Sequence, residues 1–134
     1  MEVRVKKTIV FDFDGVIHKG YKGYKDGSIY GDIDFELLDY IKKLLNDYYV
    51  VISSNRPARQ IVWHMNNLDC GLDFEVFSKD FGDNLFWNKD GVVGVTNEKA
   101  VGILYIDDRG LRYDNSKSTY DNILLIEERL DSLK

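Results

Sequence analysis

The stretch Val10-Phe11-Asp12-Phe13-Asp14-Gly15-Val16-Ile17 decides the fold, because an apolar run ends there in two carboxylates that lie one residue apart. Such a run is typical of a strand that is buried on both faces, in the middle of a parallel sheet. An uncompensated buried anion is very costly, so the two carboxylates indicate a compensating group. A hard cation such as Mg²⁺ with oxygen ligands would serve. Taken alone, the two aspartates could instead cap a turn that ends at Gly15.

The composition indicates one folded domain over residues 1–134, because 44% of the chain is apolar and its length suffices for a single core. The net charge of −5 argues against a protein that coats nucleic acid or anionic lipid, although it does not exclude a local basic patch. The one cysteine can form no internal disulfide, which fits a reducing compartment. With no long apolar run and no signal-peptide core, we expect a cytoplasmic protein with no membrane partner.

Strand patterns alternate with helix patterns along the chain. The expected elements, in order, are a strand at Arg4–Phe13, a helix capped by Asp34, a strand at Tyr49–Ile52, a helix from Pro57 to Asn67, a strand at Phe74–Phe77, a hairpin within Asn84–Thr96, a strand at Ile103–Ile106 and a helix at Asn122–Leu133. Residues 18–32 contain the turn signal Asp26-Gly27 and are expected to form a hairpin flap. This alternation predicts a three-layer α/β/α, Rossmann-like fold around a central parallel sheet.

Polar residues follow several of these strands at their carboxyl ends, where ligands gather in parallel sheets. The clusters expected to meet there are Asp12 with Asp14, Ser54-Asn55-Arg56, Lys99, and Asp107 with Asp108. Several carboxylates in one place cannot all ionise without a cation, and Mg²⁺ suits their oxygen atoms. Zinc is disfavoured because the chain lacks a Cys/His cluster. A hydroxyl, a lysine and an arginine beside the metal would suit a phosphoryl group.

The same segments, in the same order, resemble the four motifs of haloacid dehalogenase-superfamily phosphatases. The segments that carry this resemblance are Asp12-Phe13-Asp14-Gly15-Val16, Val50-Val51-Ile52-Ser53-Ser54-Asn55-Arg56, Lys99 and Tyr105-Ile106-Asp107-Asp108-Arg109. The likeness covers nearly the whole chain and is greatest for small members without a cap domain. One departure is Ala100, which stands where a proline often follows the lysine. The resemblance implies the fold of that superfamily, with a minimal cap or none and an open site roofed at most by the flap.

The resemblance also implies catalytic roles. Asp12 would be the nucleophile that forms an aspartyl-phosphate, and Asp14 the general acid and then the base. Lys99 would neutralise charge on the nucleophile and on the phosphate. Ser54 would donate a hydrogen bond to the phosphoryl oxygens, with Ser53 as its rival.

The remaining implied roles concern phosphate binding and the metal. Asn55 and Arg56 would assist Ser54 and Lys99 in binding the phosphate, although Arg56 could equally be a solvated residue at a helix start. The Mg²⁺ ligands would be the carboxylates of Asp12, Asp14 and either Asp108 alone or Asp108 with Asp107, together with the backbone carbonyl of Phe13. His18 and His64 are not expected to be catalytic, since His18 begins the flap and His64 lies in a helix.

The substrate stays open at this point. Ser54-Asn55-Arg56 and Ile106-Asp107-Asp108-Arg109 are also similar to the phosphatase domain of phage polynucleotide kinases, which implies a 3′-phosphatase on nucleic-acid ends as one alternative to a phosphatase of small molecules. A kinase is excluded because the chain has no phosphate-binding G-x-x-x-x-G-K-[ST] loop. A non-catalytic module that binds Mg²⁺ or phosphate is the alternative of another class. An open site could also borrow a lid from a second copy in a homo-oligomer.

Overall fold

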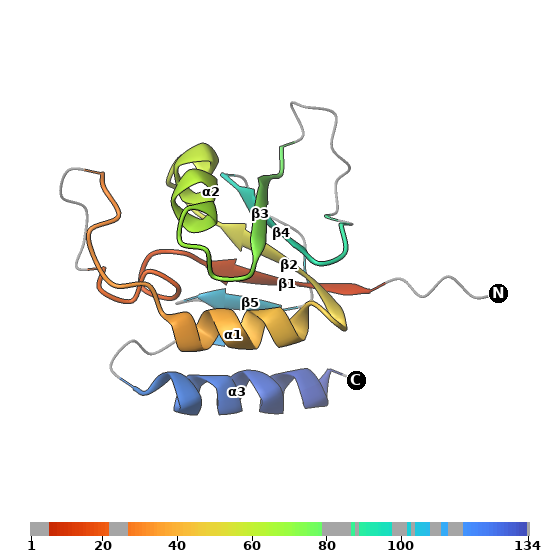
Figure 1. Cartoon of the computed structure of the whole chain (residues 1–134). Coiled ribbons are helices and arrows are strands. Elements are labelled where there is room, and N and C mark those ends of the chain that lie inside the picture. The colour runs from red at the N-terminus through yellow and green to blue at the C-terminus, as the bar shows by residue number, and fades with distance from the viewer. Residues whose placement is uncertain are drawn as a thin grey trace.

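A parallel sheet organises the protein, whose computed structural model describes residues 6–21, 27–78, 87, 89–97, 102, 104–107, 111–112 and 117–133. The strands lie in the order β3-β4-β2-β1-β5-β6, and every pairing is parallel (Figure 1). Their bounds are Lys7–Asp12 for β1, Tyr48–Ser53 for β2, Asp73–Val76 for β3, Val92–Thr96 for β4, Leu104–Asp107 for β5 and Leu111–Arg112 for β6. The α/β class with a central parallel sheet is therefore confirmed.

The quoted stretch forms the interior of this sheet, as its apolar run predicts. β1 lies between β2 and β5, and its four middle residues, 8–11, are buried. In the register of the β1–β2 pair, Asp12 lies opposite Ser53. The carboxyl ends of these two strands therefore end at the same edge of the sheet.

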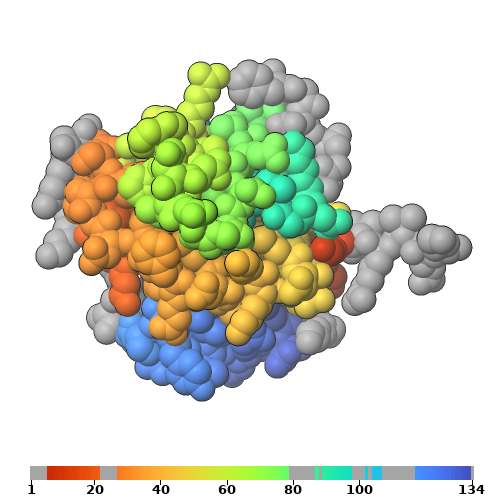
Figure 2. All heavy atoms as spheres, viewed as in Figure 1, coloured from red at the N-terminus to blue at the C-terminus, as the bar shows by residue number. Residues whose placement is uncertain are grey.

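The three described helices are α1 (Phe35–Leu44), α2 (Ala58–Asn66) and α3 (Thr119–Ser132). Their buried residues share one apolar cluster with alternate residues of the strands, such as Ile9 and Phe11. Figure 2 shows the helices as neighbouring bands of one surface, with α1 between α2 and α3. No described helix combines the length and the apolar character that crossing a membrane requires.

The opposite face of the sheet carries a second, smaller cluster. It contains Val10, Val51, Phe77 and Trp87. The described residues that cover this face belong to no helix, so the third layer of the expected α/β/α sandwich is not confirmed. Among the described residues, the side chains of Phe77 and Trp87, rather than an amphipathic helix, pack against Val10 and Val51 there.

The predicted hairpin within Asn84–Thr96 is wrong for the part that the structure describes. Val92–Thr96 forms β4, which lies between β3 and β2 and pairs in parallel with both. Both edges of β4 are thus used, and neither is available to an antiparallel partner. Gly94 explains how Trp87 fits against this strand, because a Cβ there would lie 2.6 Å from the Trp87 ring.

The flap, residues 18–32, has a paired base. The backbone N–H groups of Lys19 and Gly20 donate to the carbonyl of Asp32, and His18 forms an antiparallel bridge with Ile33. The two limbs come so close that a Cβ on Gly31 would lie 2.6 Å from the backbone of Gly20. Residues 22–26, which include Asp26 of the predicted turn, lie outside the described residues.

The predicted cap of α1 is confirmed and also joins two helices. Asp34 is buried; its Oδ1 accepts a hydrogen bond of 3.0 Å from the Leu37 N–H, and its Oδ2 accepts one of 2.5 Å from the Thr119 hydroxyl. Thr119 is the first residue of α3, which begins three residues before the predicted helix because Ser118 caps it through the Asp121 N–H. The side chain of Asp34 therefore ties the starts of α1 and α3 together.

We expect Asp34→Ala to lower the free energy of unfolding by about 2 to 4 kcal/mol. The substitution removes a helix cap and leaves the buried Thr119 hydroxyl without this acceptor. Ser118→Ala is the matched control: it removes the cap of α3 at an exposed position and should cost about 1 kcal/mol. Urea unfolding of both variants measures the difference. Equal losses in the two variants would contradict a joining role for Asp34.

Candidate functional site

A cleft of about 360 Å³ opens where β1 and β2 end. It collects five of the predicted site residues from two separate segments of the chain. The residues that line it are Asp12, Asp14, Tyr21, Gly27, Ser54, Asn55, Arg56, Pro57 and Gln60. Ser54 is among them and its rival Ser53 is not; Ser53 instead lies in β2 opposite Asp12.

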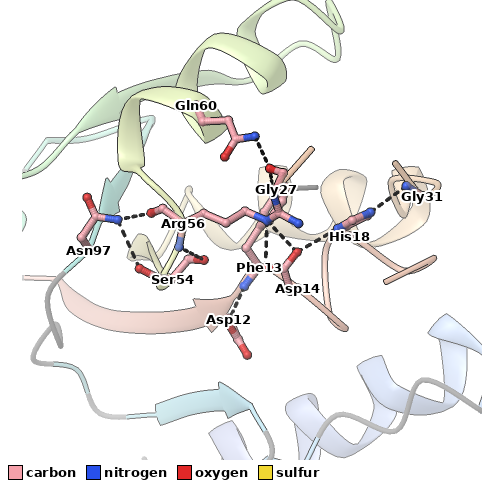
Figure 3. A network of polar contacts seen from close by, with 10 residues as sticks. All are labelled: Asp12, Phe13, Asp14, His18, Gly27, Gly31, Ser54, Arg56, Gln60 and Asn97. Carbon is pink, nitrogen blue, oxygen red and sulfur yellow. Dashed lines mark hydrogen bonds and ion pairs between the residues drawn. The ribbon is translucent and has the colours of Figure 1, made fainter. Parts of the chain in front are cut away.

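Asp14 lies between two donors from different parts of the fold (Figure 3). The Nε of Arg56 contacts its Oδ1 at 2.9 Å and its Oδ2 at 2.8 Å. On the other side, the Nδ1 of His18 lies 2.8 Å from Oδ1. The sequence predicts neither donor as a partner of Asp14, because the motifs attribute Arg56 to the phosphate and His18 only begins the flap.

The ion pair with Arg56 changes the argument for a metal. From the sequence, the two carboxylates are expected to need a cation beside them. The guanidinium of Arg56 already balances the negative charge of Asp14. Because both oxygens of Asp14 accept hydrogen bonds from protein donors, a metal ion would have to compete with those donors for this carboxylate. The part of the chain that the structure describes contains no group of three or more His, Cys, Asp or Glu side chains able to hold a metal ion.

Asp12 ends β1, and its Oδ1 accepts a hydrogen bond of 2.8 Å from the Phe13 N–H. The neighbouring strand β5 pairs Ile106 with Phe11, so its last residue, Asp107, comes one position further along at the same edge. The backbone thus brings two aspartate positions together at adjoining strand ends. The side chain of Asp107 and the whole of Asp108 lie outside the described residues, so their predicted roles as metal ligands remain predictions.

The expectation that the Phe13 carbonyl contacts the metal does not fit the turn after β1. This oxygen accepts hydrogen bonds from the N–H groups of Val16, at 3.2 Å, and of His18, at 2.8 Å. Both lone pairs of the carbonyl are therefore used within the turn. Gly15 permits this turn because its φ of +85° is accessible to glycine at little cost.

The loop between β2 and α2 is held by hydrogen bonds from Asn97, which is distant from it in the sequence. The sequence alone predicts no role for this residue. Its Nδ2 donates to the carbonyls of Ser54 and Arg56, and its Oδ1 accepts the Ala58 N–H at 3.1 Å. Asn97 thus supplies the side-chain cap that Pro57, at the start of α2, cannot provide. The only signal for Asn97 in the sequence is that it directly follows β4. This strand pairs with β2, the strand that leads into the loop.

Within the same loop, Ser54 is buried and its Oγ accepts the Arg56 N–H at 3.1 Å. Ser54 lines the cleft, and a hydroxyl that accepts one hydrogen bond keeps a hydrogen with which it can donate to an anion. Asn55 lines the cleft beside it and is exposed. Lys99, the remaining predicted phosphate ligand, lies outside the described residues.

The flap reaches the cleft at Tyr21 and at the carbonyl of Gly27. The Nη1 of Arg56 and the Nε2 of Gln60 both donate to the Gly27 oxygen, each at 2.7 Å. The guanidinium of Arg56 also lies over the Tyr21 ring, 5.9 Å from its centroid. Arg56 therefore joins the flap to Asp14, a role that needs its planar guanidinium with several donors.

His64 lies on α2, one turn beyond Gln60, and is not among the described residues that line the cleft. Burial lowers the pKa of its imidazole, and the neighbouring His18 and Arg56 lower it further.

Comparisons with known proteins identify no relative of the chain. A function must therefore be assigned from the motifs and from the geometry of the cleft. No protein-family model matches the chain, and no curated protein or solved structure is significantly similar to it.

Proposed function

We propose that this protein is a Mg²⁺-dependent phosphatase of the haloacid dehalogenase type, which hydrolyses phosphate monoesters through an aspartyl-phosphate on Asp12. One observation carries the proposal. Asp12, Asp14, Ser54, Asn55 and Arg56, chosen from the motifs, line a single cleft at the carboxyl edge of a parallel sheet. This edge is the place where α/β proteins bind their ligands.

The charges of the cleft support a need for further cations. Among the described residues that line it, Asp12 and Asp14 contribute two negative charges and Arg56 one positive charge. A phosphate dianion would be repelled by this balance. Lys99 and a divalent cation, both expected from the motifs, would reverse it.

The donor chemistry fits Mg²⁺, with Asp12, Asp107 and Asp108 as the carboxylates that we propose to hold it. Asp12 and Asp107 end two strands whose carboxyl ends adjoin in the sheet, and Asp108 follows Asp107 in the sequence. Mg²⁺ takes few carboxylates together with phosphate oxygens, and it would neutralise charge that develops on the phosphoryl group.

In the first step, an Asp12 carboxylate oxygen bonds to phosphorus while the bond to the ester oxygen breaks. The leaving oxygen takes a proton from Asp14. Arg56 and the Ser54 hydroxyl donate to the phosphoryl oxygens, where charge gathers in the transition state.

In the second step, a water molecule attacks the phosphorus of the aspartyl-phosphate, and Asp14 takes a proton from that water. The bond between phosphorus and Asp12 breaks, which releases phosphate and restores both carboxyl groups. Arg56 is already within reach of the cleft, because it contacts Asp14 and the flap carbonyl at the same time. A bound phosphoryl group would compete with Asp14 for this guanidinium.

The 3′-phosphatase alternative gains one observation, the ring of Tyr21 in the lining of the cleft. The Arg56 guanidinium lies over this ring and Tyr30 stacks on it, with centroids 6.1 Å apart, so a base or a sugar would have to displace one of them in order to stack there. Oligonucleotides with a 3′-phosphate, compared with sugar phosphates and nucleoside monophosphates, distinguish the two substrate classes. Hydrolysis of small esters alone would exclude the nucleic-acid alternative.

The test of the function is hydrolysis of p-nitrophenyl phosphate with and without Mg²⁺. We expect turnover with the metal, loss of at least about 100-fold after chelation with EDTA, and recovery when Mg²⁺ is added in excess. Calcium is the matched control, because its larger radius and longer bonds disfavour compact octahedral coordination. Undiminished turnover in EDTA would contradict a metal-dependent mechanism, and no turnover on any phosphate ester would favour the non-catalytic module.

A further inference from the structure

His18 is a buried histidine at the base of the flap, and the proposed mechanism does not use it. Its side chain is fully buried, with an exposed fraction of 0%. Both ring nitrogens have partners: Nδ1 lies 2.8 Å from Oδ1 of Asp14, and Nε2 lies 2.8 Å from the Gly31 backbone nitrogen (Figure 3). The ring therefore links the proposed acid and base to the returning limb of the flap.

The two contacts together define where the ring proton lies. The N–H of Gly31 can only donate, so Nε2 must be the unprotonated acceptor. The proton of a neutral imidazole is then on Nδ1, where it points at Asp14 and is donated to the carboxylate. The flap backbone thus selects the tautomer that can bind Asp14.

The surroundings of the ring fix its plane as well. Three aromatic rings surround it, with centroids at 5.8 Å for Phe13, 5.6 Å for Tyr21 and 5.2 Å for Tyr30. The Gly31 amide can reach the ring because the flap limbs touch at Gly20 and Gly31, where neither residue has room for a Cβ. A histidine that only filled space in an apolar core would not require this arrangement.

We propose that His18 is a positioning residue for Asp14: the Gly31 amide of the flap fixes the imidazole proton on Nδ1, and that N–H aligns the Asp14 carboxyl group with the leaving oxygen. This inference rests on the proposed phosphatase function. Arg56 is the other donor to Asp14, and substrate phosphate competes for it. His18 is therefore the donor that keeps Asp14 oriented when Arg56 turns to the phosphoryl group.

Two substitutions separate the two bonds of the ring. The amide nitrogen of Asn lies near the position of Nδ1, so His18→Asn keeps a donor for Asp14 and loses the acceptor for Gly31. The amide of Gln reaches the position of Nε2, so His18→Gln keeps the acceptor for Gly31 and loses the donor. Each variant is the matched control for the other, and thermal unfolding of both establishes that they are folded.

We expect His18→Gln to lower kcat by about 10- to 100-fold with little change in KM, because a misaligned acid and base affects the chemical step. His18→Asn should keep kcat within about threefold of the wild type and raise KM. This variant loses the acceptor for the Gly31 amide, and that loss affects the flap that lines the cleft. A purely structural histidine predicts the reverse order, with His18→Gln the more active variant. That order, or equal kcat values in the two variants, would overturn the proposal.

A second measurement separates this inference from the phosphatase function. The ¹⁵N NMR spectrum of histidine-labelled wild-type protein at neutral pH should show His18 protonated at Nδ1 and bare at Nε2. An inactive protein with this tautomer would refute the phosphatase function and leave the bond between His18 and Asp14 supported. An active protein with His18 protonated at Nε2 would refute the positioning role alone.

Discussion

Asp12→Asn should abolish hydrolysis of phosphate esters, with kcat lower by about 10⁴-fold or more. An amide is a very poor nucleophile, so the aspartyl-phosphate cannot form and the two-step route is lost. The fold should survive, because the amide oxygen of Asn can still accept the Phe13 N–H that Asp12 accepts in the wild type. The readouts are release of p-nitrophenol and the midpoint of thermal unfolding.

Asp39→Asn is the matched control for this experiment. It removes the same charge from an exposed position on α1 and should leave turnover unchanged. This comparison separates the loss of the nucleophile from a change in net charge. Turnover within about tenfold of the wild type in Asp12→Asn would refute the assignment of Asp12, because a water molecule would then have to attack phosphorus directly.

The sequence was sufficient for the elements whose signals are local. The apolar run that ends at Asp12 predicted a central parallel strand, and β1 has that position. Asp34 predicted the start of α1 because a cap depends on residues within one turn. The convergence of Asp12, Asp14 and the loop after β2 followed from strand direction alone, since parallel strands end at a common edge.

The features that the sequence did not predict depend on contacts between distant segments. Whether Val92–Thr96 pairs as a hairpin or as an interior parallel strand is decided by β2 and β3, which flank it. The cap that Asn97 gives to α2 spans 39 residues. No local pattern encodes such a partner, and an asparagine after a strand is commonly a turn residue.

The partners of Asp14 were missed for a related reason. From the sequence, Arg56 is expected to be a phosphate ligand or a solvated residue. In the structure it forms an ion pair with Asp14, which lies 42 positions earlier in the sequence. From the sequence, His18 is only the first residue of the flap. Its side chain is buried because the two limbs of the flap pair beside it, which no local pattern predicts. The carboxylate of Asp14 is half-buried, and a guanidinium supplies the counter-charge that the sequence pattern attributes to a metal ion.

Asp14→Asn should lower turnover by about 10²- to 10⁴-fold, the range expected when a general acid and base is lost. The variant keeps the nucleophile, so the first step can still proceed when the leaving group needs no proton, as with p-nitrophenolate. Hydrolysis of the intermediate still needs a proton acceptor, because water must lose a proton to attack phosphorus. We therefore expect a burst of p-nitrophenol followed by a slow phase.

The covalent intermediate is the decisive readout, because it separates Asp14 from Asp12. Acid quenching during the slow phase, followed by intact mass measurement, should find one phosphoryl group on Asp14→Asn and none on Asp12→Asn. Asp14→Asn also weakens the ion pair with Arg56, so unfolding must be measured to exclude a loss of structure. A folded Asp14→Asn protein with neither burst nor adduct would show that Asp14 is needed before attack on phosphorus, as a metal ligand or as the partner that orients Arg56. An adduct on Asp14→Asn would leave proton transfer in the second step as the function of this carboxylate.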